Sequence, residues 1–221
     1  MIILFKYATR GRPKLFVETL EKYYSMLSGK HSCYFIISMD ENDRSMNNDL
    51  MKCYLDGKDN LFYYFNPPAS KIAAINANME GTYFDVLFVV SDDMIPQVKG
   101  FDDIIARDMQ KHFPGMDGAL HYDDGIQHQN LITFSIMGCE LYKQIGYIYH
   151  PEYESQWCDN EFTEVVRKMD RYIWIPRMIV RHAWKAHGND QTYAVSDANF
   201  QKDRAVYLRR RAAGFAEPIK I

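Results

Sequence analysis

The sequence lacks any pair of cysteines spaced closely enough to form a Cys-x-x-Cys motif. Structural zinc sites are built on such closely spaced thiolates, so this absence argues against a cysteine zinc site. Small secreted domains held together by disulfides carry many more cysteines for their length. The four cysteines of this chain lie far apart, at Cys33, Cys53, Cys139 and Cys158. We therefore expect free thiols in a reducing, cytoplasmic setting.

Long apolar runs are also missing. No segment approaches the roughly 20 apolar residues of a membrane-spanning helix, and the apolar start at residues 1–5 is too short for a signal peptide. The charges nearly balance, with 26 Lys and Arg against 29 Asp and Glu. Domains that bind nucleic acid through bulk charge are usually strongly basic. We expect a soluble protein with no transmembrane segment and no nucleic-acid partner.

What the sequence does have is the composition of a globular protein. It has 221 residues, of which 47% are hydrophobic and 25% charged. A chain of this size buries about 70% of its surface on folding, which gives a full core. Because no internal repeat, low-complexity tract or linker divides the chain, we expect one compact domain.

Short apolar segments alternate with helical patterns through the first half of the chain. Helices are predicted from Pro13 to Leu27, up to about Leu55, and from Lys71 to Met79. Unbroken apolar strands separated by helices are typical of a parallel sheet covered on both faces. The predicted fold class is therefore α/β, with an open, mostly parallel central sheet flanked by helices. The strands are predicted at residues 2–7, 34–39, 61–65 and 86–90.

The second half is less regular. Strands are predicted at 131–136 and 172–180, and helices at 104–113 and around 162–169. A charged helix is predicted at 196–213. Its arginines favour a solvated helix end, since cations stabilise helix C-termini, although they could also meet a phosphate or an anionic lipid. These arginines are Arg209, Arg210 and Arg211.

Polar residues follow three of the predicted strands. Ligands of open parallel sheets bind at the carboxyl ends of the strands, where this chain has 9–12 (Thr-Arg-Gly-Arg), Asp40, and the pair Asp92 and Asp93. Arginines bind phosphate through paired hydrogen bonds. Carboxylates repel phosphate unless a cation bridges them, and Mg²⁺ or Mn²⁺ takes one or two carboxylates plus phosphate oxygens. The pattern predicts a metal–diphosphate site.

Aspartates after strands also have a purely structural use, because their side chains satisfy turn backbone. For Asp40 the turn and the functional interpretation are both open. For Asp92 and Asp93 we favour function, since two adjacent like charges at the mouth of an apolar strand cost energy unless a cation lies nearby.

Four segments in this order resemble the nucleotide-sugar glycosyltransferases of the GT-A type, most similar to family 2. The resemblance covers nearly the whole chain, to about residue 190. The family's metal motif is often Asp-x-Asp, and here Ser91 holds the first position. Family 2 members frequently have only the last two acidic residues of the motif, which here are Asp92 and Asp93. The segments are Thr9-Arg10-Gly11-Arg12, Asp40, Phe88-Val89-Val90-Ser91-Asp92-Asp93 and Trp157-Cys158-Asp159-Asn160-Glu161-Phe162.

The resemblance implies a GT-A, Rossmann-like fold with a donor half at about 1–95, an acceptor half at about 96–190 and a C-terminal helix at 191–221. It places Asp40 at a uracil-like base, Asp92 at the ribose and Asp93 at the metal. The donor-binding residues implied are Thr9, Arg10, Arg12, Asp40, Lys71, Asn76, Asp92 and Asp93. Read without the family, Lys71 is typical of a solvated helix lysine, whereas Asn76 lies in an apolar stretch and needs a hydrogen-bond partner.

On the acceptor side, the resemblance makes Asp159 the catalytic base, with Glu161 at most a supporting contact. From the sequence alone, Asp159 is as readily an N-cap. The resemblance also suggests a late metal-binding histidine at His182, with His187 as a competing choice and a core or surface histidine as the alternative. Asp124 is a further candidate for a sugar contact.

The function that these residues imply is a metal-dependent glycosyltransferase of the hexosyltransferase type, using Mn²⁺ or Mg²⁺. The donor would be a nucleotide diphosphate sugar, with UDP indicated by Asp40, and the acceptor a hydroxyl of a glycan or another molecule. Family likeness implies an inverting reaction with Asp159 as base. Two alternatives remain: a sugar nucleotidyltransferase, which should carry a glycine-rich loop where this chain has only Gly11, and a non-catalytic nucleotide-binding module.

Overall fold

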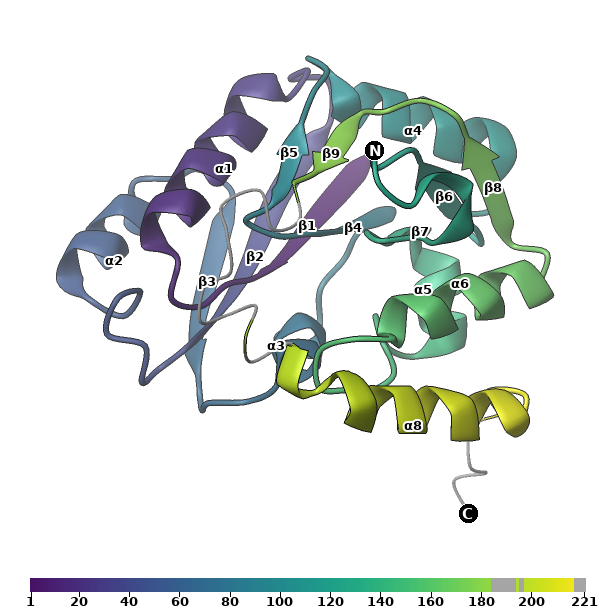
Figure 1. The fold of residues 1–221 in the computed structure, drawn as a ribbon. Helices are drawn as coiled ribbons and strands as arrows, with labels where there is room; N and C mark the ends of the chain where they lie inside the picture. The colour runs from purple at the N-terminus through teal and green to yellow at the C-terminus, as the bar shows by residue number, and fades with distance from the viewer. Residues whose placement is uncertain (184–193, 195–196, 217–221) are drawn as a thin grey trace.

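The computed structural model describes residues 1–183, 194 and 197–216, and Figure 1 shows a central sheet with helices on both faces. The sheet has seven strands in the order β3-β2-β1-β4-β7-β6-β8, and β5 pairs with β9 in a small second sheet. The strands are β1 (Ile2–Ala8), β2 (Ser32–Asp40), β3 (Leu61–Asn66), β4 (Val86–Val90), β5 (Met94–Pro96), β6 (Ala119–Tyr122), β7 (Ile136–Gly138), β8 (Tyr172–Ile175) and β9 (Val180–His182).

The helices connect these strands across both faces. They are α1 (Pro13–Met26), α2 (Asp49–Asp56), α3 (Lys71–Asn76), α4 (Phe101–His112), α5 (Cys139–Ile145), α6 (Cys158–Lys168) and α8 (Phe200–Ala212). None of the helices in the described part of the chain combines the length and the apolar character that a membrane crossing requires. All four cysteines are free.

The first four strands confirm the predicted parallel half of the sheet. β1 runs parallel to both β2 and β4, and β2 runs parallel to β3. β7 is antiparallel to β4 and β6, whereas β6 is parallel to β8. The sheet is thus open and mostly parallel, as predicted, and the carboxyl ends of β1, β2, β3 and β4 lie along one edge.

The side chains of β1 alternate between two apolar cores. Phe5 and Tyr7 face the core that α1 and α4 cover, while Leu4 faces the core beneath α3, α5 and α6. Because both faces of β1 are buried, its sequence is a continuous apolar run except for Lys6. The two cores hold the sheet between its helices.

Two strand predictions in the second half are wrong. The predicted strand at 131–136 is a loop up to β7, and its apolar side chains at Ile132 and Phe134 are buried without strand pairing. The backbone N–H of Ile132 is instead satisfied by the Thr163 hydroxyl, at 3.0 Å. The predicted strand at 172–180 divides into β8 and β9, because Pro176 has no N–H to donate to a ladder.

Strand β6 was not predicted from the sequence. A close backbone approach accompanies this part of the sheet: a Cβ on Gly138 of β7 would lie 2.1 Å from the carbonyl oxygen of Met116, and one on Gly118 would overlap the ring of Phe113. Only glycine permits this spacing.

The prediction of a solvated arginine run on α8 is wrong for Arg210. Arg210 is only 4% exposed and pairs with Glu161 of α6 at 2.8 Å. Its two neighbours remain exposed, but they too pair with glutamates: Arg209 with Glu152, and Arg211 with Glu164. The predicted helix start at Ser196, and residues 191–193 and 217–221 of the expected C-terminal helix region, lie outside the described residues.

Candidate functional site

The ends of β1 and β4 meet at the pair Asp92 and Asp93. The register pairs Tyr7 with Val90, which brings the residues after β1 beside those after β4. The Tyr7 hydroxyl donates to Oδ1 of Asp92 at 2.9 Å, and the Thr9 hydroxyl donates to Oδ2 at 3.3 Å. Strand pairing therefore fixes Asp92 beside the predicted donor residue Thr9.

Asp92 is buried, and its environment favours the protonated form. Burial raises the pKa of Asp92 to about 7; the charge of Asp93 adds to the rise, while the hydrogen bond from Tyr7 and the charge of Arg12 oppose it. Arg12 is the N-cap residue of α1. The predicted donor residues Thr9, Arg12 and Asp92 thus interact at one point of the sheet edge.

The loops after β1 and β2 also meet. Arg10 pairs with Asp40 at 2.7 Å, and the backbone N–H of Gly11 donates to Asp43 at 2.7 Å. Burial raises the pKa of Asp40, while the charge of Arg10 opposes the rise. The side chain of Asp40 is only 8% exposed and is held at the strand edge by this arginine, and the base contact predicted for Asp40 stays a prediction.

Asp93 and His182 are brought together by the small second sheet. β5 and β9 pair Met94 with His182, and the backbone N–H of Ala183 donates to the carbonyl of Asp93 at 2.6 Å. His182 Nε2 then lies 3.7 Å from Oδ2 of Asp93, while the hydroxyl of Ser91 donates to Oδ1. These residues are far apart in sequence, and only the fold makes them neighbours.

The charge state of Asp93 allows it to bind a cation. Burial alone would raise the pKa of Asp93, but the His182 imidazole, the Ser91 hydroxyl and the positive charge of Lys71 together hold it well below its usual range. The carboxylate is therefore ionised throughout the physiological range. His187, the competing histidine, lies outside the described residues.

Asp93 and His182 together fit a divalent ion whose remaining ligands come from the substrate. Within residues 1–183, 194 and 197–216, no group of three or more His, Cys, Asp or Glu side chains could hold a metal. Mg²⁺ usually binds through one or two carboxylates plus substrate phosphates, and imidazole with carboxylate also suits Mn²⁺. Two protein ligands plus diphosphate oxygens would satisfy such an ion.

Asp124 supports His182 from the other side. Its Oδ1 accepts the backbone N–H groups of residues 126, 127 and 128 at 2.8, 2.7 and 3.1 Å, and Oδ2 accepts the Thr133 hydroxyl at 2.8 Å. Oδ2 also lies 4.0 Å from Nδ1 of His182. Asp124 was considered as a sugar contact, but here its carboxylate organises the loop and faces His182. The Asp-Asp-Gly turn was the only sequence signal for this role.

Asp159 lies in the first turn of α6. The N-cap is Trp157, in the left-handed region at φ 63°, so the alternative interpretation of Asp159 as the N-cap is wrong. Oδ1 of Asp159 accepts the N–H of Asn160 at 2.9 Å. Burial raises the pKa of Asp159, opposed by this hydrogen bond and by the charges of Lys71 and His182.

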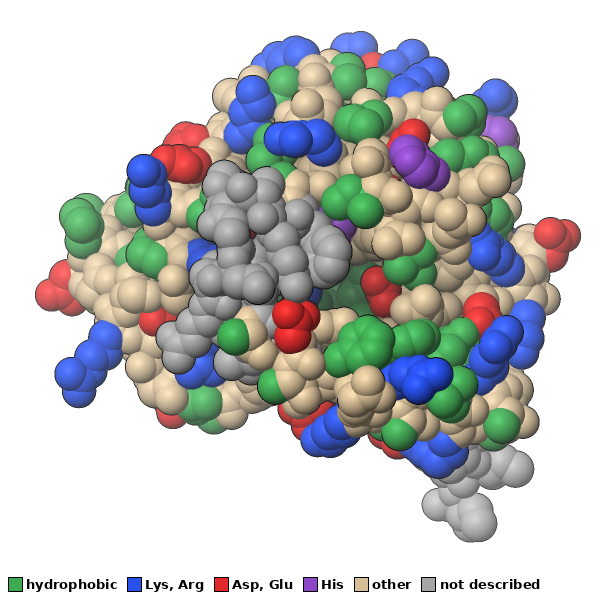
Figure 2. All heavy atoms as spheres, viewed as in Figure 1, with side chains coloured by type: hydrophobic (Ala, Val, Ile, Leu, Met, Phe, Trp, Pro, Cys, Tyr) green, Lys and Arg blue, Asp and Glu red, His purple; other side chains and the backbone are tan. Residues whose placement is uncertain are grey.

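Lys71 connects the donor side of the site with the acceptor side. It begins α3, and its charge lowers the pKa of both Asp93 and Asp159. Lys71 is exposed, as the alternative of a solvated helix lysine expects, and its predicted donor contact stays a prediction. The approach of His182 to Asp93 is the central feature of the site, and the charge of Lys71 acts on both Asp93 and Asp159. Figure 2 shows acidic side chains beside a hollow on the face that it views.

Asn76 has the partners that its apolar surroundings require. Its Oδ1 accepts the N–H groups of Ile148 and Tyr149 at 2.9 and 3.2 Å, and its Nδ2 donates to the carbonyl of Tyr149 at 2.7 Å. The side chain thus ties α3 to the loop after α5. Its predicted donor contact stays a prediction.

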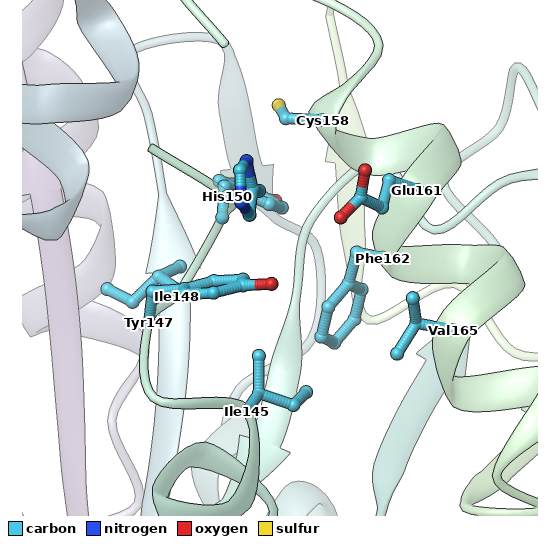
Figure 3. A pocket seen from close by; sticks show the side chains of 9 residues that line it. Ile145, Tyr147, Ile148, His150, Cys158, Glu161, Phe162 and Val165 are labelled. Carbon is cyan, nitrogen blue, oxygen red and sulfur yellow. The ribbon is translucent and has the colours of Figure 1, made fainter. Parts of the chain in front are cut away.

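Glu161 does not serve the acceptor side directly. It is buried, it pairs with Arg210, and it accepts the hydroxyl of Tyr153 at 2.8 Å. It also lines a small cavity of about 20 Å³ behind α6, beside His150, Cys158 and Phe162 (Figure 3). The cavity has room for about one water molecule, so it is no substrate pocket.

Comparisons with known proteins give structural likeness only. No protein-family model matches the sequence, and no curated protein matches it. TarS residues 1–349 from S. aureus, also solved with UDP and with UDP-GlcNAc, has a TM-score of 0.64 at 13% identity and covers 81% of this chain and 59% of its own. The mannosyltransferase PcManGT from Pyrobaculum calidifontis, in complex with GDP-Man and Mn²⁺, has a TM-score of 0.68 at 12% identity over 98% of this chain and 65% of its own.

A third similar structure belongs to another enzyme class. The 4-diphosphocytidyl-2C-methyl-D-erythritol synthase from Anaerococcus prevotii has a TM-score of 0.55 at 9% identity, over 91% of this chain and 96% of its own. The chain spans about three fifths of the TarS structure and about two thirds of the mannosyltransferase. The strand order, the register and the likeness to TarS and to the mannosyltransferase show that the chain has the GT-A fold of the nucleotide-sugar glycosyltransferases.

Proposed function

We propose that the chain is a metal-dependent glycosyltransferase that moves a sugar from a nucleotide diphosphate sugar to an acceptor hydroxyl. The observation that supports this most is the approach of His182 to Asp93, with Nε2 3.7 Å from Oδ2, at the edge of the sheet where the charges of Lys71 and His182 also act on Asp159. A phosphate-bridging ion and a base are the two groups that such a transfer needs, and we assign the ion to Asp93 with His182 and the role of base to Asp159.

The nucleotide would bind along the ends of β1 and β2. Thr9, Arg10, Arg12, Asp40 and Asp92 would surround it, with the arginines at phosphate and Asp92 at the ribose. TarS is solved with UDP-GlcNAc and the mannosyltransferase with GDP-Man, which supports a nucleotide sugar but not one base. Our choice of UDP rests on Asp40, whose acceptor oxygens suit the N–H of uracil.

A divalent ion, Mn²⁺ or Mg²⁺, would be held by Asp93 and His182. When bound, it neutralises the charge that develops on the departing diphosphate. The protein's own residues would prepare this site: Ser91 donates a hydrogen bond to Asp93, Asp124 faces His182, and Lys71 would add positive charge near the phosphates. Preorganised charges of this kind stabilise the transition state more than the ground state.

Asp159 would act as the general base. Sugar hydroxyls are poor nucleophiles, and a carboxylate within hydrogen-bond reach takes the proton as the new bond forms. Burial raises the pKa of Asp159, which makes it a stronger proton acceptor than an exposed aspartate. The acceptor oxygen would attack the anomeric carbon opposite the diphosphate, so that one displacement inverts that centre.

The test combines binding and turnover. Nucleotide sugars are screened by thermal shift with and without Mn²⁺, because a ligand that binds the folded state raises its stability, by about 2.7 kcal/mol at a hundredfold excess over Kd. Asp159→Asn is then expected to keep this shift but to lose transfer by about 10²–10⁴-fold. Asp170→Asn, an exposed position just beyond the same helix, is the matched control. Unchanged turnover in Asp159→Asn would remove it from the role.

A sugar nucleotidyltransferase is the second candidate. The structure from Anaerococcus prevotii supports it, since this chain matches 96% of that protein. Against it, the loop after β1 has Gly11 as its single glycine, whereas a triphosphate-binding loop is rich in glycine. Pyrophosphate released from a nucleoside triphosphate would favour this candidate. Nucleotide binding with neither reaction would instead favour a non-catalytic module.

Three further expectations remain proposals. The donor half at about 1–95 and the acceptor half at about 96–190 would act as the two sides of this site. We also propose a cytoplasmic location, because free thiols suit a reducing compartment. Hexoses would be the transferred sugars, and no nucleic acid would bind.

A further inference from the structure

One face of α8 carries four side chains that each contact the same short stretch of the chain, whatever else they touch. Its members follow at steps of three, four and three residues, which places them in one stripe along the helix. We call Phe200, Asp203, Tyr207 and Arg210 the α8 stripe. Asp203 and Arg210 are 0% and 4% exposed, so two of the four are buried charges. Each member contacts the segment 154–161, which contains Asp159.

Asp203 fixes the turn that precedes α6. One carboxylate oxygen accepts the backbone N–H of Glu154 at 3.0 Å, and the other accepts those of Ser155 and Gln156 at 2.9 and 2.8 Å. Three consecutive amides directed at one carboxylate set the path of the chain into the helix.

The aromatic members hold the residue where α6 begins. Trp157 packs against Tyr207 at 5.0 Å and against Phe200 at 5.4 Å between ring centroids. Its backbone lies in the left-handed region, which non-glycine residues rarely adopt without support from their surroundings. The side-chain packing supplies that support two residues before Asp159.

Arg210 fixes the other side of Asp159. Its Nε and Nη2 each donate to one oxygen of Glu161 at 2.8 Å, and the Tyr153 hydroxyl donates to the same carboxylate at 2.8 Å. This bidentate geometry determines orientation as well as energy. Since Glu161 lies two residues after Asp159, the first turn of α6 is held from both ends.

We propose that the α8 stripe positions the carboxylate of Asp159, and that Asp203 and Arg210 are positioning residues for the transfer step. This rests on the proposed function, in which Asp159 is the base. A buried ion pair is weak evidence for stability, since apolar residues of equal size often serve as well, and its directional bonds instead specify one geometry.

The test compares three neighbouring arginines. Arg210→Met is expected to lower kcat at least tenfold with the donor KM within about twofold of wild type, because a displacement of about 1 Å at a catalytic group can cost about 10²-fold. Arg209→Met and Arg211→Met remove the same charge from exposed positions, 60% and 57% exposed, and are expected to keep wild-type kcat. An unchanged kcat in folded Arg210→Met would overturn the proposal.

A second pair of variants covers the case in which Arg210→Met does not fold. Arg210→Lys keeps the charge but not the two parallel hydrogen bonds, and we expect the same selective loss of kcat. Exchanging the partners, as Arg210→Glu with Glu161→Arg, is expected to recover part of that loss. A purely structural role would lower thermal stability without this split between kcat and KM, and that result would overturn the proposal.

Hydrogen exchange separates this inference from the proposed function. If the wild type transfers no sugar, the proposed function fails, but amide exchange is still measurable. We expect Arg210→Met to speed exchange at residues 158–161, where the Glu161 amide donates to the Trp157 carbonyl at 3.1 Å, and to leave the strands unchanged. Positioning by α8 would be refuted if Arg210→Met sped amide exchange throughout the chain, or if it did not speed exchange at residues 158–161.

Discussion

Lys6 is a fully buried lysine in the middle of β1. Its Nζ donates to the Ser38 hydroxyl, which in turn donates to Oδ1 of Asn78 at 2.9 Å; Asn66 donates to the same oxygen at 2.9 Å. Burial lowers the pKa of Lys6 from 10.5 to about 7. The perturbation we consider is Lys6→Met, which keeps an unbranched side chain, shorter by one heavy atom, and removes the amine.

The lowered pKa of Lys6 sets the size of the expected change in stability. A fall of about 3.5 in the pKa, at about 1.4 kcal/mol per unit, corresponds to about 5 kcal/mol of destabilisation at pH 7 and below. Lys6→Met removes this cost but leaves Ser38 without its donor, a loss of about 1 kcal/mol. The variant should therefore be more stable than wild type by about 4 kcal/mol at pH 7.

The sign of the pH dependence follows from proton binding. Between about pH 7 and 10.5 the unfolded chain keeps the lysine proton and the folded chain does not, so the free energy of unfolding of the wild type rises by about 1.4 kcal/mol per pH unit. The advantage of Lys6→Met should thus shrink to about 1 kcal/mol at pH 9. Below pH 7 both states hold the proton, and the difference should be constant.

Urea unfolding of both proteins at pH 6, 7, 8 and 9 measures these differences, and other titrating groups cancel because both proteins share them. Lys14→Met is the control, since the Lys14 side chain is 89% exposed and its removal should give no pH-dependent difference. A Lys6→Met advantage that is equal at pH 7 and 9, or a wild type that is the more stable protein at pH 7, would refute the reasoning.

Three more outcomes are expected. The rate of transfer should fall with decreasing pH through the pKa of Asp159, at a pH above the 3.8 of an ordinary aspartate, because only the ionised carboxylate accepts a proton; a kcat that stays level down to pH 4 contradicts this. Asp93→Asn should abolish the Mn²⁺-dependent part of the thermal shift given by the donor, and a retained Mn²⁺ effect would exclude Asp93 as a ligand. Gly138→Ala should lower the free energy of unfolding by about 1–3 kcal/mol, because its Cβ would lie 2.1 Å from the Met116 carbonyl oxygen. Gly57→Ala, whose nearest contact would be at 3.5 Å, should change stability little in the same urea assay.

The parallel half of the fold was predictable because its strands are buried on both faces. Such strands appear as unbroken apolar runs, and the predicted 2–7, 34–39, 61–65 and 86–90 lie within β1, β2, β3 and β4 with errors of at most two residues at each end. The helices between them have their own start signals, such as Pro13 at the beginning of α1.

The second half was less predictable because burial there does not imply strand pairing. Ile132 and Phe134 are apolar and buried, yet they lie in a loop whose backbone is satisfied by side chains. β6 has four residues and includes His121, so its apolar run is too short to stand out. Its place in the sheet depends on partners that are distant in sequence.

The site was predictable only where one local rule applied. The rule that ligands bind at strand ends placed Asp40, Asp92 and Asp93 along one edge. The approach of His182 to Asp93 depends on β5 and β9, which are three residues each and carry no pattern strong enough to show their pairing. The family resemblance, and not the residues themselves, pointed to His182.

The buried charges of α8 escaped the sequence analysis for a different reason. Amphipathic patterns identify a buried helix face by its apolar residues, but Asp203 and Arg210 are charged and still face inward. Their partners are three backbone amides and a glutamate elsewhere in the chain, so no local pattern could mark them as buried.

The pairing of β5 with β9 also sets an order of events during synthesis. His182 leaves the ribosome 89 residues after Asp93, a delay of about 4–18 s at roughly 5–20 residues per second. The nascent chain can assemble its first four parallel strands in that interval, while the two side chains assigned here to the cation have not yet met. If Asp93 and His182 hold a cation as proposed, the affinity for that cation is acquired late in translation, because a nascent polypeptide that has already formed its first four strands lacks one of the two ligands until β9 has been made.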